Sequence, residues 1–138
     1  MRLRKNAKIE LLKTVPLFAR CTRRELDALA AEADELAVPA GRALARQGER
    51  GRDFVVIVDG AADVSKNGRR VNRLGSGDFL GEIALVSGGP RTATVTTTAP
   101  SRLLVLSDRA FRRVVREMPS VQASILSALS ERLQADAL

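Results

Sequence analysis

The residues best suited to chemistry lie in the stretch 77–95, GDFLGEIALVSGGPRTATV. A short apolar run there carries one carboxylate, Glu82, and a Gly-Gly-Pro loop then leads to Arg91 and Thr92 at the start of an alternating segment. Arginine is suited to binding a phosphate, and free amides at a helical turn bind phosphate oxygens. A nearby carboxylate can accept a hydrogen bond from a ribose hydroxyl. The pattern is typical of a site for a sugar phosphate.

Composition excludes several kinds of enzyme site. The chain has no histidine and one cysteine, Cys21, which excludes His-based triads and most zinc or non-haem iron sites. Nucleophilic catalysis would need a Ser–Lys pair or a rarer arrangement, and nothing in the sequence indicates one. We therefore predict that the chain is not an enzyme and holds no metal or cofactor.

Charge and hydropathy indicate a cytosolic protein with a basic surface. One cysteine permits no internal disulfide, no apolar run approaches the ~20 residues that span a bilayer, and the N-terminus lacks the features of a secretory signal. The net charge of +7 attracts anions. Trp and Tyr are absent and only four Phe occur, so we favour a solvated surface over a nucleic-acid reader. Whether the basic N-terminus contacts lipid or nucleic acid stays open.

The distribution of glycine predicts the order of the elements. All ten glycines fall between Gly41 and Gly89, and glycine is typical of tight turns between strands. The 138 residues suffice for one domain. We predict a mainly β fold with flanking helices, in which about eight short strands form a roll or small barrel. The expected parts are N-terminal helices over about 5–34, a β-roll over about 35–107 and two C-terminal helices over about 108–136.

Local signals place the individual elements. A helix is expected over 5–13, and Thr22 to Glu25 form a capping box that opens a second one. Asn67-Gly68 is a strong hairpin signal and Asp59-Gly60 a further one. The expected strands are 35–38, 42–47, 54–58, 62–66, 69–74, 91–97 and 102–107.

The C-terminal region is expected to hold two helices. Ser107 or Asp108 caps the first, and Pro119 suits the first position of the second. The second helix carries an apolar stripe at helical spacing, made of Val121, Ile125, Leu129 and Leu133. This stripe either packs on the β-roll or forms a lid or a dimer seam.

From about Leu12 to Leu133 the chain resembles the cyclic nucleotide-binding domain family, which includes kinase regulatory subunits, nucleotide-gated channels and the catabolite activator protein. The central resemblance is GEIAL at 81–85 followed by PRTATV at 90–95. Supporting marks are PLF at 16–18, Gly41, Gly48, VDG at 58–60 and GSGDF at 75–79. The resemblance implies the β-roll of that family and a stand-alone receptor or regulatory module.

The resemblance also implies roles for the residues of 81–92. Arg91 would pair with the phosphate oxygens, Glu82 would accept from the ribose 2′-hydroxyl, and Thr92 would offer its hydroxyl to phosphate or base. Main-chain groups would come from Gly81, Ile83 and Ala84. Two alternatives stay open: Glu82 and Arg91 could form an internal salt bridge that closes the loop, and Thr92 could be an ordinary strand residue.

Two departures from the family's pattern bear on ligand and partner. No aromatic residue follows Phe111, so the base would be covered from the last helix, with Arg132 and Leu133 as candidates. Cyclic AMP is the expected ligand and cyclic GMP the alternative. The chain stops at Leu138, so DNA binding through a helix-turn-helix is not expected.

The resemblance further implies that the ligand moves the last helix, which a protein partner or a second copy of the chain would read. An interaction module of the same fold that needs no nucleotide is the main alternative. A cupin-like oxygenase is disfavoured because the chain has no histidine to bind a metal.

Overall fold

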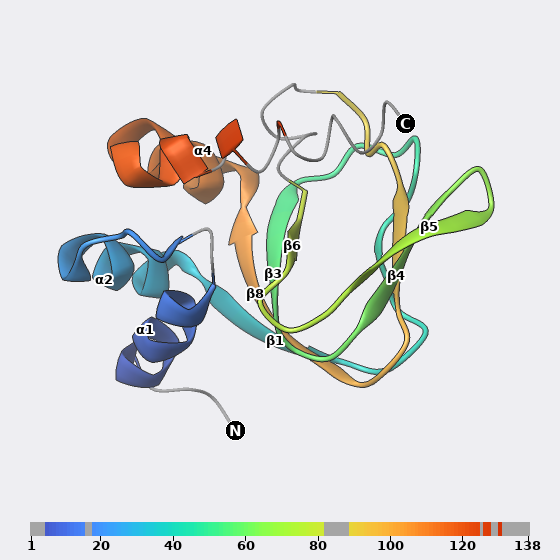
Figure 1. The fold of residues 1–138 in the computed structure, drawn as a ribbon, viewed down its shortest axis with the longest axis horizontal. Coiled ribbons are helices and arrows are strands. Elements are labelled where there is room, and N and C mark those ends of the chain that lie inside the picture. Colours follow the sequence, from blue (N-terminus) through green and yellow to red (C-terminus); the bar gives the residue numbers. More distant parts are fainter. Residues whose placement is uncertain (1–4, 16–17, 82–88, 125, 128–129, 131–138) are drawn as a thin grey trace.

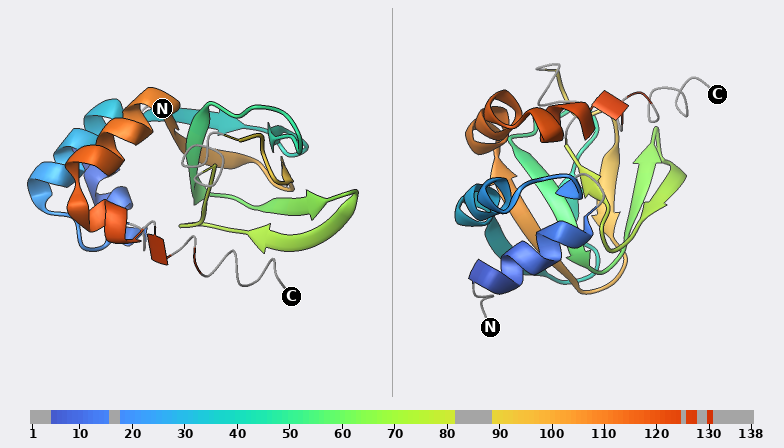
Figure 2. Two further views of the ribbon diagram at one scale, coloured as in Figure 1. Left: turned by 90° about the horizontal axis from the view of Figure 1, so that it is seen from above. Right: turned by 60° about the vertical axis from the view of Figure 1, so that its left-hand side comes forward.

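The computed structural model describes residues 5–15, 18–81, 89–124, 126–127 and 130. Helices α1, α2 and α4 gather on one side of the strands, and the β4–β5 hairpin extends on the other (Figures 1 and 2). The bounds are α1 Lys5–Thr14, α2 Arg23–Glu32, β1 Asp34–Val38, β2 Ala43–Ala45, β3 Asp53–Asp59, β4 Ala62–Lys66, β5 Arg69–Leu74, β6 Phe79–Leu80, β7 Thr94–Thr97, β8 Ser101–Ser107 and α4 Asp108–Glu117. Residues 119–124 are also helical.

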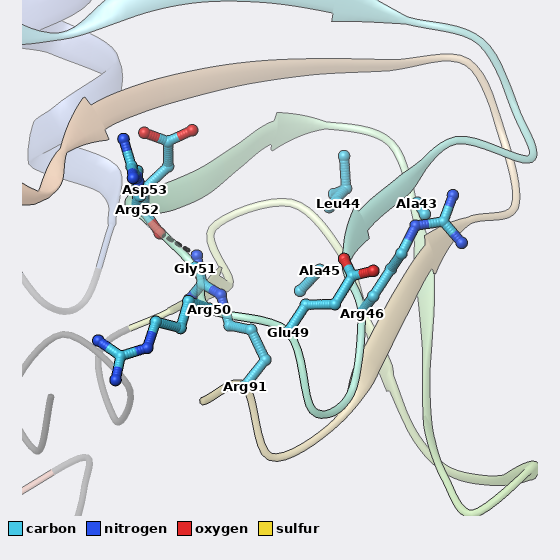
Figure 3. A pocket seen from close by; sticks show the side chains of 10 residues that line it. All are labelled: Ala43, Leu44, Ala45, Arg46, Glu49, Arg50, Gly51, Arg52, Asp53 and Arg91. Carbon is cyan, nitrogen blue, oxygen red and sulfur yellow. Dashed lines mark hydrogen bonds between the residues drawn. The ribbon is translucent and has the colours of Figure 1, made fainter. Parts of the chain in front are cut away.

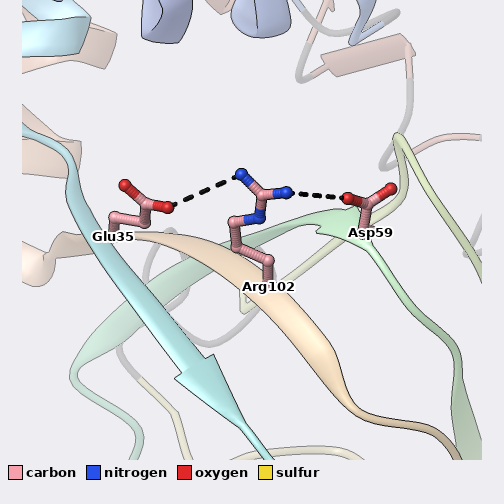
Figure 4. A network of polar contacts seen from close by, with 3 residues as sticks. All are labelled: Glu35, Asp59 and Arg102. Atoms are coloured by element: carbon pink, nitrogen blue, oxygen red, sulfur yellow. Dashed lines mark hydrogen bonds and ion pairs between the residues drawn. The ribbon is translucent and has the colours of Figure 1, made fainter. Parts of the chain in front are cut away.

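The described strands form two four-stranded antiparallel sheets, which confirms the predicted β-roll. One sheet has the order β1-β8-β3-β6 and the other β2-β7-β4-β5. Their pairings close no barrel in the described part of the chain. On the first sheet Arg102 of β8 lies between two carboxylates, 3.8 Å from Glu35 Oε1 on β1 and 3.2 Å from Asp59 Oδ2 on β3 (Figure 4). These partly exposed ion pairs join three strands but add little stability, about 1 kcal/mol or less each.

Strand β3 is buried on both faces and separates two cores, which explains its continuous apolar sequence. Phe54 and Val56 face the helices, whereas Val55 and Ile57 face the second sheet. The rings of Phe54 and Phe111 of α4 stack at a centroid distance of 4.6 Å. The first sheet is therefore the central layer of the fold, between the helices and the second sheet.

Helices α2 and α4 begin at the predicted caps. The Thr22 side chain accepts from Glu25 N–H at 3.1 Å while Thr22 N–H donates to Glu25 Oε1 at 2.8 Å, which confirms the capping box. Ser107 caps α4 by accepting from Ala110 N–H at 3.2 Å. Arg113 of α4 pairs with Glu32 of α2. In the described residues, no helix is both long and apolar enough to cross a membrane.

One predicted hairpin is wrong and two predicted strands are too long. Asp59-Gly60 does not close a hairpin, because β3 and β4 belong to different sheets. Gly60, at φ +129°, carries the chain across, where a Cβ would lie closer than 3.0 Å to Ser101. Strand β2 covers only 43–45 of the predicted 42–47, and β7 covers only 94–97 of the predicted 91–97. The strands are shorter because the chain between them forms loop hydrogen bonds, such as those of Arg91 with Gly48 and Glu49. The eighth strand, β6, consists of only two residues and was not predicted.

Candidate functional site

The predicted phosphate-binding arginine lies in a narrow slot. Arg91 is only 6% exposed, and its Nη2 donates to the carbonyl oxygen of Asp53 at 2.5 Å. Gly51 and Gly81 lie against the guanidinium, and a Cβ at either position would approach it closer than 3.0 Å. The slot therefore needs glycine at both positions.

One loop holds the main chain of Arg91 as well as its side chain. Between β2 and β3, Gly48 N–H donates to Arg91 C=O at 2.9 Å, and Arg91 N–H donates to Glu49 C=O at 2.8 Å. The strand that follows this loop, β3, supplies the carbonyl of its first residue, Asp53. Arg91 is thus fixed at backbone and guanidinium by residues about forty positions earlier in the chain. A cation positioned in this way is preorganised for an anion.

A hollow of about 270 Å³ lies beside Arg91 (Figure 3). Four arginines and two carboxylates line it, which gives a net charge of +2; they are Arg46, Arg50, Arg52, Arg91, Glu49 and Asp53. Arg46 and Arg50 are exposed, and their guanidinium groups point outward on opposite sides in Figure 3. The hollow is smaller than the pockets of about 300–1,000 Å³ that hold drug-sized ligands. Its size and charge fit the anionic end of a ligand.

The structure describes three of the eight predicted site residues. Gly81 and Arg91 lie together, with Gly81 in a left-handed conformation at φ +103°. Thr92 is exposed and lies before β7 rather than in it, so it is not the strand residue of the alternative reading. The others lie outside the described residues: Glu82, Ile83, Ala84, Arg132 and Leu133. The predicted alternatives for Glu82 therefore stay predictions.

Sequence reasoning missed two residues of the slot, Gly51 and Asp53. Asp53 acts through its backbone carbonyl, so its residue type gives no signal. Gly51 has no left-handed φ, and its role is visible only when Arg91 is placed against it. The available signal was the glycine itself, one of two in the short loop GERG at 48–51.

A second polar cluster lies among the helices, away from the hollow. The Glu25 carboxylate accepts from Ser120 Oγ at 3.0 and 3.1 Å, and the hydrogen bond from Thr22 N–H lowers the pKa of Glu25. Burial raises the pKa of the neighbouring Cys21 thiol, with a further contribution from Glu25. This cluster fastens the helical segment 119–124 to α2. Among the described residues, no group of three His, Cys, Asp or Glu could hold a metal ion.

Known proteins of similar sequence include a kinase regulatory subunit and a channel. A regulatory subunit of cAMP-dependent protein kinase from Mycosarcoma maydis is 35% identical over 121 residues, 81% of this chain and 23% of its own length. A cyclic nucleotide-gated potassium channel from Rhizobium etli is 34% identical over 123 residues, 89% of this chain and 34% of its own length. The chain thus spans about a third of the channel and about a quarter of the kinase subunit.

A solved structure and a family model also match this chain. The regulatory domain of Toxoplasma gondii PKA, crystallised with cAMP, superposes with a TM-score of 0.84 at 27% identity, over 93% of this chain and 50% of that one. Residues 35–118 match the model of the cyclic nucleotide-binding domain, and this range contains both sheets except one residue of β1, together with α4. The chain belongs to the cyclic nucleotide-binding domain family.

Proposed function

We propose that this chain binds cyclic AMP as a regulatory module and that Arg91 receives the cyclic phosphate. The buried guanidinium, held between Gly51 and Gly81 by the Asp53 carbonyl, is the observation that carries the proposal. A guanidinium is always charged and presents its N–H donors in a planar fork that suits phosphate oxygens. Within this proposal Thr92, Glu82 and the backbone of Gly81, Ile83 and Ala84 contact the ligand, and Arg132 or Leu133 covers the base.

The choice of cyclic AMP over cyclic GMP is supported by the relatives, two of which carry cAMP in their names. Competition of the two nucleotides against one labelled analogue tests it. Displacement by cyclic AMP at lower concentration is expected, and a clear preference for cyclic GMP would overturn this choice.

Calorimetric titration of wild type and Arg91→Ala tests the site. Removing one partner of a buried charge-assisted interaction costs about 2–5 kcal/mol, so we expect cyclic AMP to bind the variant at least about thirtyfold more weakly. Glu82→Ala should have a smaller effect, because its expected partner is a neutral hydroxyl. Near wild-type affinity of Arg91→Ala would remove Arg91 from the site.

We further propose that the ligand acts without catalysis, by changing the position of the final helix. The start of that helix packs on the N-terminal helices through the buried Val121 and the Ser120–Glu25 hydrogen bonds, so a shift there would alter a surface that a partner or a second copy of the chain can read. Hydrogen exchange over 120–138 should change on saturation with cyclic AMP. Unchanged protection would indicate a ligand that only stabilises the fold.

One observation favours a second candidate, a module that binds its partner without nucleotide. Arg91 already bonds within the protein, to Asp53, so the guanidinium could serve the fold alone. A thermal-shift assay separates the two, because a ligand that binds only the native state raises its stability. No shift with either cyclic nucleotide at saturation would favour this second candidate.

A further inference from the structure

The loop that holds Arg91 is tied to a neighbouring hairpin by one side chain, Gln47. Its Nε2 donates to Asn67 Oδ1 at 3.0 Å, and its Oε1 accepts from Asn67 N–H at 2.8 Å. The backbone N–H of Gln47 donates to Thr94 Oγ1 at 3.0 Å. Gln47 therefore joins three segments: the β2–β3 loop, the first residue of β7 and the turn between β4 and β5.

The sheet order shows that the hydrogen bonds between Gln47 and Asn67 cross the end of β7. Strand β7 lies between β2 and β4, with Ala45 opposite Val95 and Ser65 opposite Thr94. Gln47 follows β2 and Asn67 follows β4, so the Gln47 side chain spans the N-terminal end of β7. Arg91 lies just before this end of β7, where Gln47 on one side is bonded to Asn67 on the other.

The turn that Gln47 bonds, Asn67-Gly68, has a well-defined backbone conformation. Asn67 has φ +53° and Gly68 has φ +80°, as expected for a two-residue turn whose twist matches the strands that it joins. Asparagine adopts this left-handed conformation more readily than most residues. A loop bonded twice to such a turn gains a fixed position, whereas a loop held only to β7 would move with the chain around Arg91.

We propose that Gln47 is a positioning residue for the phosphate site. Gln47 is absent from the lining of the hollow. It acts through the next two residues of the loop, Gly48 and Glu49, whose backbones bond Arg91 on both sides. This role rests on the proposed binding of a cyclic phosphate at Arg91, since preorganisation of the guanidinium raises affinity for an anion only if the anion binds there.

A graded set of variants tests the effect on affinity by calorimetry with cyclic AMP. Gln47→Leu removes both side-chain bonds, whereas Asn67→Gly removes only the bond to Oδ1 and keeps both the N–H donor and the left-handed backbone. We expect affinity to fall by about threefold in Asn67→Gly and by about tenfold in Gln47→Leu. Thr14→Val, which removes an exposed hydroxyl that donates to Leu11 C=O in α1, should bind as wild type.

Amide hydrogen exchange without ligand gives an independent measurement. In Gln47→Leu the amides of Gly48 and Arg91 should exchange at least about fivefold faster, because both bond across the loop. The amide of Thr98, which bonds Ala61 C=O, should be unchanged. Equal acceleration at Thr98 would mean general loosening of the sheet and would refute the positioning role.

The two measurements separate this proposal from the proposed function. If wild type binds no cyclic nucleotide but exchange at Gly48 and Arg91 changes as expected, the ligand assignment fails and the control of Arg91 by Gln47 stands. If wild type binds and Gln47→Leu equals Thr14→Val in affinity or in exchange, Gln47 does not position the site.

Discussion

Replacing Gly51 by alanine tests the glycine slot directly. A Cβ at this position would lie closer than 3.0 Å to Nε, Cζ and Nη2 of Arg91, so the end of the Arg91 side chain would have to move. Gly51 has no left-handed φ, so alanine introduces no backbone strain of its own. The substitution should therefore act only by expelling the Arg91 guanidinium from the slot.

The magnitude follows from the bond that is lost. Expulsion breaks the hydrogen bond from Arg91 Nη2 to Asp53 C=O, and a hydrogen bond to a charged group contributes about 1.5–3 kcal/mol. Replacing glycine by alanine raises the free energy of unfolding by about 0.4–1 kcal/mol, because alanine restricts the unfolded chain. We expect a net loss of about 0.5–2.6 kcal/mol in the free energy of unfolding. Affinity for cyclic AMP should fall by about 10- to 150-fold if the phosphate needs the guanidinium in place.

Urea unfolding and calorimetric titration measure the two effects, with Gly75→Ala as the matched control. Gly75 also lacks a left-handed φ, and a Cβ there meets nothing within 4 Å, so this variant should be neutral or slightly more stable. Adding Gly51→Ala to Arg91→Ala should cost nothing further, because the expelled group is already absent. If Gly51→Ala matched Gly75→Ala in stability and affinity, the slot would have no role in holding Arg91.

Three further predictions concern the fold. Gly60→Ala should lower the free energy of unfolding by at least about 2 kcal/mol, because the residue has φ +129° and a Cβ would overlap Ser101; a wild-type urea midpoint would contradict this. Ser107→Ala should cost about 1 kcal/mol by removing the cap of α4, and Ser107→Asp, measured the same way, should keep most of it. Glu25 has a lowered pKa in the folded state, so its contribution to stability is complete above the unfolded value of about 4.3 and is lost as pH falls through the lower folded value. Unfolding measured from pH 6 to 3 should therefore show a steeper loss for wild type than for Glu25→Gln, and parallel curves would contradict the role of this carboxylate and its partner Ser120.

Features that depend on neighbouring residues in the chain could be predicted from the sequence. The capping box at Thr22 and the cap at Ser107 are found where their motifs place them. The strands over 62–66 and 69–74 have the predicted bounds, because Asn67-Gly68 fixes the turn between them. Their register shifts by one residue between Val64 and Ser65, which the turn does not determine. The helix–sheet–helix order could also be predicted, because all glycines lie in the part of the chain between Gly41 and Gly89, where turns join the strands.

Features that depend on which strands meet could not be predicted in this way. Asp59-Gly60 has the composition of a hairpin turn, yet it connects two different sheets. Residues 91–93 continue the alternating pattern of the strand that follows them. The backbone of Arg91 nevertheless bonds the β2–β3 loop, and β7 begins only at Thr94. In both cases a contact from a distant part of the chain overrides the local preference.

The sequence by itself determined the order of the elements, their caps and the presence of an arginine suited to a phosphate, since each is encoded within a few residues. Only the tertiary structure decided how that arginine is held. Gly51, Asp53 and Gln47 are about forty residues from Arg91 in the chain, and two of them act through a missing side chain or a backbone carbonyl. A backbone carbonyl carries no signature in a sequence and a loop glycine does not reveal its partner, so these groups become a site only when the folding of both sheets brings the β2–β3 loop against the start of β7.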